Sequence, residues 1–200
     1  MKVHGACGQI DFQRNVESID LNSEKLYFIA RDVFIEQRVV FFGGYATKLY
    51  SKYMKKDARL LMEKIPDFDV ISEDPELCVT ITIERLKANG FNNIRTVKRK
   101  KIGELIPERI EIKVDNETIA FVYKPIACHN YNTIYIDGKH INVATIETML
   151  SFYIAFYYTS EPYYSKDRIL CMARFLFDVE QKNRLAQKGL LKRFSIKCYG

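Results

Sequence analysis

Apolar positions along this chain recur with two periods, and each period predicts a different kind of element. Spacings of three and four residues, as in the stripe that begins at Leu26, indicate helices with one buried face. The clearest helix start is Asp74-Pro75-Glu76, which combines an acidic cap with a proline in the first turn. Helices are expected at residues 23–37, 46–50, 57–64, 75–89, 145–159 and 166–187.

Alternating apolar and polar residues predict strands between these helices. The segments on either side of Asp115-Asn116 and of Asp137-Gly138 alternate in this way, which is typical of β-hairpins closed by tight turns. A short apolar run over residues 39–42 leads into Gly43-Gly44. Strands are expected at residues 68–72, 93–99, 109–114, 118–123, 133–136 and 140–143.

The order of these elements predicts an α+β fold with a mixed sheet covered by helices and a helical C-terminal part. We expect residues 1–22 to be an irregular lead-in, 23–143 the main domain, and 144–200 a helical segment that completes or flanks the core. No internal repeat or low-complexity tract divides the 200 residues, a length that suits one ordinary domain or two small ones.

Composition and charge narrow the class of protein. With 48% hydrophobic and 28% charged residues, the chain is neither disordered nor collagen-like. The 31 Lys and Arg residues exceed the 25 Asp and Glu residues, which leaves a formal charge of +6. A surplus of this size suits a polyanionic partner such as nucleic acid or a nucleotide.

The five cysteines are widely spaced and form no Cys-x-x-Cys pair, so neither a disulfide framework nor a zinc site is expected. This usage indicates a reducing compartment. Cys128-His129 is interpreted as a structural pair rather than a catalytic one. The first residues lack the apolar region of a signal peptide, and the most apolar stretch, 149–158, is about half of a bilayer span, so no membrane segment is expected.

The most informative positions are Gly43-Gly44 and the later pair Asp67 and Asp69. Glycines at the start of a helix allow backbone N–H groups to approach a phosphate. Two acids two residues apart project from one face of a strand, as Mg²⁺ requires when it also takes phosphate oxygens. Each signal is weak by itself, and their order along the chain strengthens both.

These residues carry a resemblance to a known family. Phe42-Gly43-Gly44 and Asp67-Phe68-Asp69-Val70 resemble the motifs of the DNA polymerase β-like nucleotidyltransferase superfamily. Within that superfamily, GGYATKLY, IPDFDVIS and IAFVYKP are similar to segments of the poly(A) polymerase catalytic subunits of large DNA viruses, both poxvirus-like and giant-virus-like. The resemblance covers roughly residues 23–200 and is carried by short motifs.

The resemblance implies a nucleotidyltransferase-type sheet and a template-independent transfer of AMP from ATP to an RNA 3′ end, with Mg²⁺ or Mn²⁺ as cofactor. Asp67 and Asp69 would hold the metal ions. Implied partners are RNA and a processivity subunit or second copy, in a host cytoplasm or virion. The nucleotide would contact Gly43, Gly44, Thr47 and Lys48.

The family also has a third carboxylate on a later strand, and the position that aligns with it here is Phe121. Without that acid, the metal ion that activates the attacking hydroxyl loses a ligand, and transfer is expected to fall by orders of magnitude. Glu111 is a possible catalytic substitute. It would lie opposite Phe121 if the hairpin turn has three residues, and opposite Ala120 if it has two. The alternative is that Glu111 is a solvated strand residue.

The densest basic cluster follows the predicted strand over 93–99. It suits an RNA backbone or a triphosphate, and equally a solvated strand end. Its members are Lys98, Arg99, Lys100 and Lys101.

Two functions from different classes therefore remain open. The first is an active poly(A) polymerase. The second is a catalytically degenerate nucleotidyltransferase-like subunit that binds nucleotide or RNA without transfer, as Phe121 suggests. Because the polymerases that the chain resembles are longer, these 200 residues would be a fragment or a reduced version of one.

Overall fold

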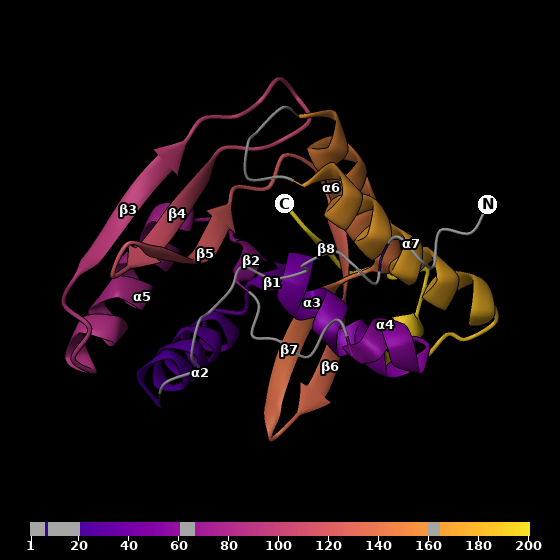
Figure 1. The fold of residues 1–200 in the computed structure, drawn as a ribbon, viewed down its shortest axis with the longest axis horizontal. Helices are drawn as coiled ribbons and strands as arrows, with labels where there is room; N and C mark the ends of the chain where they lie inside the picture. The colour runs from indigo at the N-terminus through magenta and orange to yellow at the C-terminus, as the bar shows by residue number, and fades with distance from the viewer. Residues whose placement is uncertain (1–6, 8–20, 61–66, 160–164) are drawn as a thin grey trace.

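The computed structural model describes residue 7 and residues 21–60, 67–159 and 165–200 (Figure 1). The helices are α2 (Leu21–Glu36), α3 (Gly43–Tyr50), α4 (Lys56–Leu60), α5 (Pro75–Ala88), α6 (Ile146–Tyr158) and α7 (Lys166–Lys182), with 3₁₀ turns η1 (Ser51–Tyr53) and η2 (Gly189–Leu191). The strands are β1 (Val40–Phe42), β2 (Phe68–Ile71), β3 (Ile94–Arg99), β4 (Arg109–Val114), β5 (Glu117–Tyr123), β6 (His129–Ile136), β7 (Lys139–Ala144) and β8 (Cys198–Tyr199).

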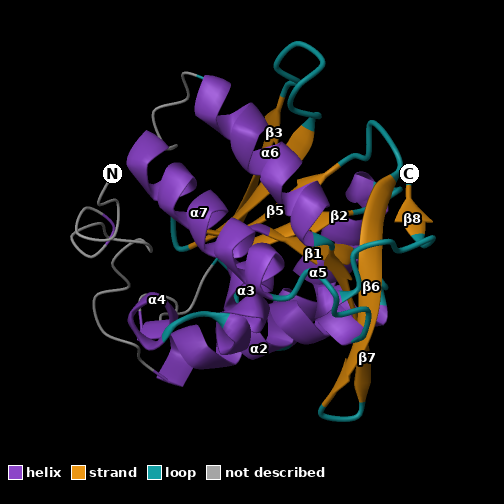
Figure 2. Ribbon diagram, turned by 90° about the vertical axis from the view of Figure 1, so that its right-hand side faces the viewer, coloured by secondary structure: helices purple, strands orange, loops and turns teal. Residues whose placement is uncertain are grey.

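The described strands form one eight-stranded sheet in the order β3-β4-β5-β2-β1-β7-β6-β8. The β2–β5 and β1–β7 pairs are parallel, and the other pairs are antiparallel. Helices pack on both faces of the sheet (Figures 1 and 2). The expected α+β fold with a mixed sheet and a helical C-terminal part is confirmed.

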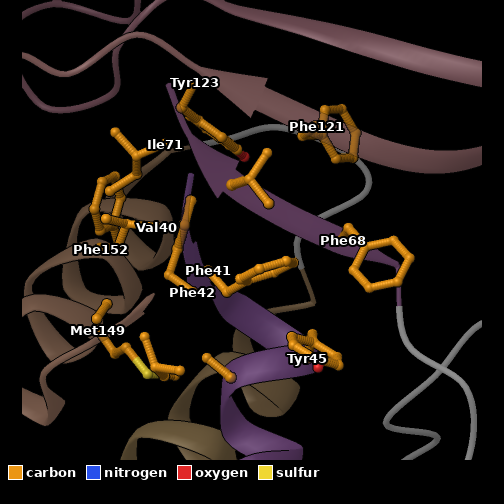
Figure 3. Close-up of a cluster of buried hydrophobic side chains, with 14 of the residues drawn as sticks. Val40, Phe41, Phe42, Tyr45, Phe68, Ile71, Phe121, Tyr123, Met149 and Phe152 are labelled. Carbon is orange, nitrogen blue, oxygen red and sulfur yellow. The ribbon is translucent and has the colours of Figure 1, made fainter. Parts of the chain in front are cut away.

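Strand alternation in β1 and β2 gives the sheet two distinct apolar faces. Phe41 and Phe68 point toward α2, where their rings lie 6.4 and 5.7 Å from that of Phe34. Phe42, one residue after Phe41, points the opposite way and stacks on Phe152 of α6 at 4.4 Å (Figure 3). We call the side that carries Phe42 the α6 face. Both faces are closed by large aromatic side chains, which fixes the register of the central strands.

The two predicted hairpins are present, and each is closed by a two-residue turn in the left-handed region. Asp115 and Asn116 have φ of 50° and 68°, and Asp137 and Gly138 have φ of 49° and 78°. These are the conformations that Asn, Asp and Gly adopt most readily.

Several element ends differ from the expectation for a physical reason. Helix α3 begins at Gly43, not at Ala46, because the left-handed Gly43 turns the chain directly from β1 into the helix. Strand β6 begins at His129, not at residue 133, because β8 pairs with its start. Helix α7 ends at Lys182 instead of continuing to 187. The second half of the helix expected over 57–64 and most of the lead-in lie outside the described residues.

The expectation of no disulfides was wrong. Cys7 is joined to Cys171 and Cys128 to Cys198, with Cα–Cα distances of 5.8 and 5.2 Å. The partners are 164 and 70 residues apart, so only the tertiary fold brings them together. No local spacing of the cysteines predicts these pairs.

Buried residues of α6 and α7 belong to the same apolar cluster as those of β1 and β2. The division of the chain at residues 22 and 143 stays a prediction. Within the described ranges, every helix is too short or too polar to cross a bilayer.

Candidate functional site

One row of residues crosses the α6 face at the centre of the sheet. Asp69 of β2 lies between Phe42 of β1 and Phe121 of β5, and Glu111 of β4 lies directly beyond Phe121. Residues paired in this way project from the same face. The position at which the resemblance predicts a third acid is therefore the immediate neighbour of Asp69, and it is occupied by the buried Phe121.

Gly43 and Asp69 are packed against each other too closely for any other residue at position 43. Gly43 has a φ of +61°, and a β-carbon built on it would lie 2.7 Å from Cγ of Asp69. The backbone N–H of Gly44 donates a hydrogen bond to the Asp69 carboxylate. The start of α3 and the acid of β2 thus form one structural unit.

The Asp69 carboxyl is half-buried, and its protonation is finely balanced. Burial, followed by the nearby charge of Asp67, raises its pKa to about 7. The positive charges of Arg168 and Arg109 and the hydrogen bond from Gly44 act in the opposite direction. A carboxyl held in this state gains strongly from a bound cation.

Asp67 immediately precedes β2 and is also half-buried. Among the described residues, no group of three or more His, Cys, Asp or Glu side chains could hold a metal ion. Two carboxylates nevertheless fit Mg²⁺ or Mn²⁺ when the remaining ligands are waters and phosphate oxygens. The donor set therefore suits a cation that arrives with a nucleotide.

Thr47 lies inside the fold and supports the Gly43 turn. Its hydroxyl donates to the Gly43 carbonyl at 2.8 Å and is 2.9 Å from the hydroxyl of Tyr153 in α6. Lys48, the next residue of α3, is half-buried. Nucleotide contacts by Thr47 and Lys48 stay predictions.

The register that the sequence left open is resolved by a β-bulge. The turn has two residues, but Ile112 pairs with Ala120 while Lys113 pairs with Thr118, so Ile119 is the extra residue. This shift brings Glu111 opposite Phe121, on the α6 face.

The Glu111 carboxylate is engaged by neighbouring side chains. Arg99 contacts it at 2.6 Å, the Thr118 hydroxyl donates to it at 2.5 Å, and the Lys113 ammonium lies at 3.4 Å. Burial alone would raise the pKa of Glu111, but these hydrogen bonds and charges outweigh it and hold the pKa below its ordinary value. Glu111 is also two strands, about 10 Å, from Asp69. A catalytic role for Glu111 stays a prediction, and its contacts are those of a structural ion pair.

Strand alternation divides the basic run between the two faces. Lys98 reaches Glu76 at the start of α5 at 2.6 Å, whereas Arg99 contacts Glu111 on the α6 face. Lys100 and Lys101 follow the end of β3 and are exposed. The run is therefore not one surface, and its RNA-binding role stays a prediction.

Three residues near the acids were not predicted from the sequence to be part of the site. Arg109 of β4 and Arg168 of α7 are close enough to lower the pKa of Asp69, and the charge of Asp69 helps to raise the pKa of the buried Tyr153. Only tertiary packing unites these positions, although an arginine within the apolar β4 strand is a local irregularity that could have drawn attention.

Comparisons with known proteins support the fold. No family model matches the chain, and no curated protein sequence does. Among solved structures, the Megavirus polyadenylate synthase superposes with a TM-score of 0.58 at 18% identity, over 86% of this chain and 35% of that one. The aminoglycoside enzyme ANT(2")-Ia, solved with adenylyl-2"-tobramycin, matches with a TM-score of 0.40 at 14% identity, over 82% and 99% of the two chains.

The chain thus spans about a third of the length of the polyadenylate synthase to which it is similar. The first match agrees with the mixed sheet and covering helices described above. The chain has a nucleotidyltransferase-like fold.

Proposed function

We propose that this chain is a nucleotidyltransferase-type domain that binds a nucleoside triphosphate with a divalent cation and does not transfer the nucleotide efficiently. Binding involves the start of α3, at Gly43 and Gly44, and the carboxylates of Asp67 and Asp69. Because the acid needed for transfer is replaced by Phe121, the domain acts as a nucleotide-binding subunit or as part of a larger enzyme.

The contact between Gly43 and Asp69 carries the proposal. A left-handed glycine pressed against a half-buried acid is expensive, since it restricts position 43 to one residue type. The acid itself has a pKa raised by burial and by the charge of Asp67. Such arrangements occur where function requires them. Arg168 adds a positive charge beside the same acid, which suits the phosphates of a nucleotide.

In the proposed complex, the carboxylates bind the cation and the start of α3 binds the phosphates. Asp67 and Asp69 would hold Mg²⁺ or Mn²⁺, which neutralises the phosphates of the bound nucleotide. The N–H groups at the start of α3 would face the phosphates, and the helix dipole favours negative charge there. Tyr153 and Thr47 keep the glycine turn in place through their buried hydrogen bonds.

Efficient transfer would require a third carboxylate beside Asp69 to help deprotonate the attacking hydroxyl. Phe121 occupies that position, and Glu111 is committed to Arg99 and Thr118. Neither side chain can accept the proton as the structure stands. This is the reason to expect binding without turnover.

Adenylyl transfer from ATP to an RNA 3′ end is the second candidate. It is favoured by the match of 86% of this chain to a polyadenylate synthase. In this case, the acid would have to come from elsewhere in a longer protein or from a partner.

Thermal unfolding with ATP and Mg²⁺ tests the binding proposal. We expect ATP with Mg²⁺ to raise the Tm of the wild type by several degrees, and neither ATP alone nor Mg²⁺ alone to do so. The double variant Asp67→Asn/Asp69→Asn should lose the shift. An equal shift in that variant would contradict the proposal.

Primer extension with labelled nucleotides, an RNA primer and Mn²⁺ separates the two functions. We expect no extension by the wild type and measurable extension by Phe121→Asp, with Phe121→Asn as the uncharged control. Extension by the wild type that disappears in Asp67→Asn/Asp69→Asn would establish the second candidate instead. Extension that survives in that double variant would exclude both.

A further inference from the structure

A cavity with a volume of about 140 Å³ lies between the end of η1, helix α4 and the C-terminal half of α7. We call it the α4–α7 cavity. Its inner wall is apolar and buried, and it is formed by Met54, Ala58, Phe175 and Val179. Cys7, which a disulfide joins to α7, adds a third segment of the chain to this wall. Figure 1 shows α4 beside α7, on the side of the molecule away from β3 and α5.

The α4–α7 cavity has room for one ring or a short carbon chain, and not for a nucleotide. An apolar cavity of this size holds a molecule of about the size of benzene. The rings of Tyr53 and Phe175 both line it, and aromatic side chains pack favourably against another ring. The cavity is also separate from the nucleotide site, because Val179 lies about 16 Å along α7 from Arg168, the residue that approaches Asp69.

The mouth of the α4–α7 cavity carries a surplus of positive charge. Lys55, just before α4, and Lys182, the last residue of α7, line it from opposite sides and are exposed. Neither lysine has an ion-pair or hydrogen-bond partner among the described residues. Of the two acids that line the cavity, Asp178 is bonded to Arg174 at 3.1 Å, which leaves Asp57 as the single opposing charge. A negative headgroup is therefore favoured at this mouth.

We infer that the α4–α7 cavity binds a small apolar monocarboxylate. The apolar body, of about the size of one ring, would fill the buried wall, and the carboxylate would reach the ammonium groups of Lys55 and Lys182. Burial of the body provides affinity, and the two lysines select the sign of the headgroup. This inference goes beyond the proposed function and does not depend on it.

Benzoate is the probe, and the methionine methyl groups of the unmodified protein report where it binds. In a ¹³C-methyl methionine spectrum, the signal of Met54 should shift with saturable benzoate binding, with a Kd of about 1 mM or tighter for a ligand of this size. The signal of Met149 in α6, which does not line the cavity, should stay in place. Met54→Leu assigns the signal. No saturable shift at Met54, or an equal shift at Met149, would overturn the inference.

Three ligands with the same ring and different headgroups test the role of charge. Benzoate should bind most tightly, benzyl alcohol less tightly, and benzylamine about tenfold more weakly than benzoate. Acetate, which has the carboxylate but no ring, should give no saturable shift. If benzylamine or benzyl alcohol binds as tightly as benzoate, the assignment of a carboxylate is wrong. If acetate binds as tightly, the apolar wall does not contribute.

Matched variants test which residues hold the ligand. Lys55→Gln/Lys182→Gln should weaken benzoate binding about fivefold and leave benzyl alcohol unaffected. Lys56→Gln/Lys188→Gln is the control, because it removes the same charge from neighbouring positions that do not line the cavity. Ala58→Leu extends a side chain into the cavity, so it should abolish binding of all three ring compounds without lowering Tm. Equal losses in both double variants, or unchanged binding to a folded Ala58→Leu protein, would contradict the assignment.

The nucleotide site provides an independent control. ATP with Mg²⁺ should not displace benzoate from the α4–α7 cavity, and Asp69→Asn should leave benzoate affinity unchanged. Loss of the Met54 shift on addition of ATP would mean that benzoate occupies the anion site beside Arg168, and the inference would fail. Benzoate binding at Met54 in a protein that shows no response to ATP would refute the proposed function and leave this inference standing.

Discussion

Two carboxyl groups in one row of the sheet have pKa values shifted in opposite directions. Asp69 and Glu111 project from the same face with only Phe121 between them. The pKa of Asp69 is raised to about 7, whereas that of Glu111 is held below its ordinary value. Burial acts to raise the pKa of both acids, but only at Glu111 do hydrogen bonds and neighbouring positive charges outweigh it.

The comparison separates an acid with a complete set of partners from an acid whose burial is not fully offset. Glu111 has two cations and a hydroxyl within contact distance, so burying it is compensated inside the protein. At Asp69, the hydrogen bond from Gly44 and the charges of Arg168 and Arg109 do not outweigh burial and the charge of Asp67, so its pKa stays raised. An acid left in this condition is a better indicator of a binding site than an acid in a complete ion pair.

The largest effect on stability is expected from a substitution at Gly43 that displaces the Asp69 carboxylate. Gly43→Ala would force a β-carbon into the Asp69 carboxylate, in addition to the strain of a left-handed alanine, about 1–3 kcal/mol. We expect strong destabilisation in urea unfolding and no stabilisation by ATP with Mg²⁺. Gly103→Ala is the matched control, because Gly103 has a similar φ of +54° and nothing within 4 Å of the new carbon. Equal effects of the two substitutions would mean that the contact with Asp69 is unimportant.

The next largest loss of stability is expected when the negative charge of Glu111 is removed. Glu111→Gln leaves Arg99 and Lys113 without their counterion, and both are partly exposed, so we expect a loss of about 1–3 kcal/mol in the free energy of unfolding. Stabilisation by ATP with Mg²⁺ should be unchanged. Loss of that stabilisation, with the fold intact by circular dichroism, would return Glu111 to the candidate site. Glu117→Gln, on the exposed start of β5, is the control.

A smaller effect, of opposite sign, is expected for Asp69→Asn. The pKa of Asp69 is about 7 in the folded protein and about 4 in the unfolded chain, so the folded state holds a proton that the unfolded state has lost. This contribution to stability is present at low pH and is lost as pH rises from about 4 to about 7. Asp69→Asn should therefore raise Tm by a few degrees at pH 8 and by less at pH 5. A lower Tm at pH 8 would contradict the proposed cost of burying this acid.

The smallest expected effect is a difference between the titration midpoints of the two carboxyl groups, which can be measured directly. In a ¹³C titration of the carboxyl carbons, Asp69 should have a midpoint near pH 7, and Glu111 one below the ordinary glutamate value. Adding Mg²⁺ with ATP should lower the midpoint of Asp69 and leave that of Glu111 in place. Asp69→Asn and Glu111→Gln assign the signals. Similar midpoints for both residues would remove the basis of the comparison.

Much of this arrangement could be predicted from local patterns. The hairpins at Asp115-Asn116 and Asp137-Gly138 follow from turn residues between alternating strands, and the start of α5 follows from its acidic cap. Asp67 and Asp69 are two residues apart at the start of β2, so their proximity follows from spacing alone. The position of Phe121 beside Asp69 required the family resemblance, because β2 and β5 are distant in sequence and pair in parallel.

Other features depend on contacts that no local pattern encodes. The bulge at Ile119 decides the partner of Glu111, and the disulfide pairs are fixed by the tertiary fold. Arg168 reaches the Asp69 region only because α7 packs near α3. Such features arise from the fit between elements, which a periodic sequence pattern does not describe.

The bulge at Ile119 makes one residue of β5 dispensable for strand pairing. It separates the register of the Asp115-Asn116 turn from the register at Phe121, because the pairs before and after Ile119 are offset by one residue. Deletion of Ile119 would leave every remaining pair of the β4–β5 ladder with its present partner. The row that contains Asp69 would therefore keep its alignment if the chain were one residue shorter at this point.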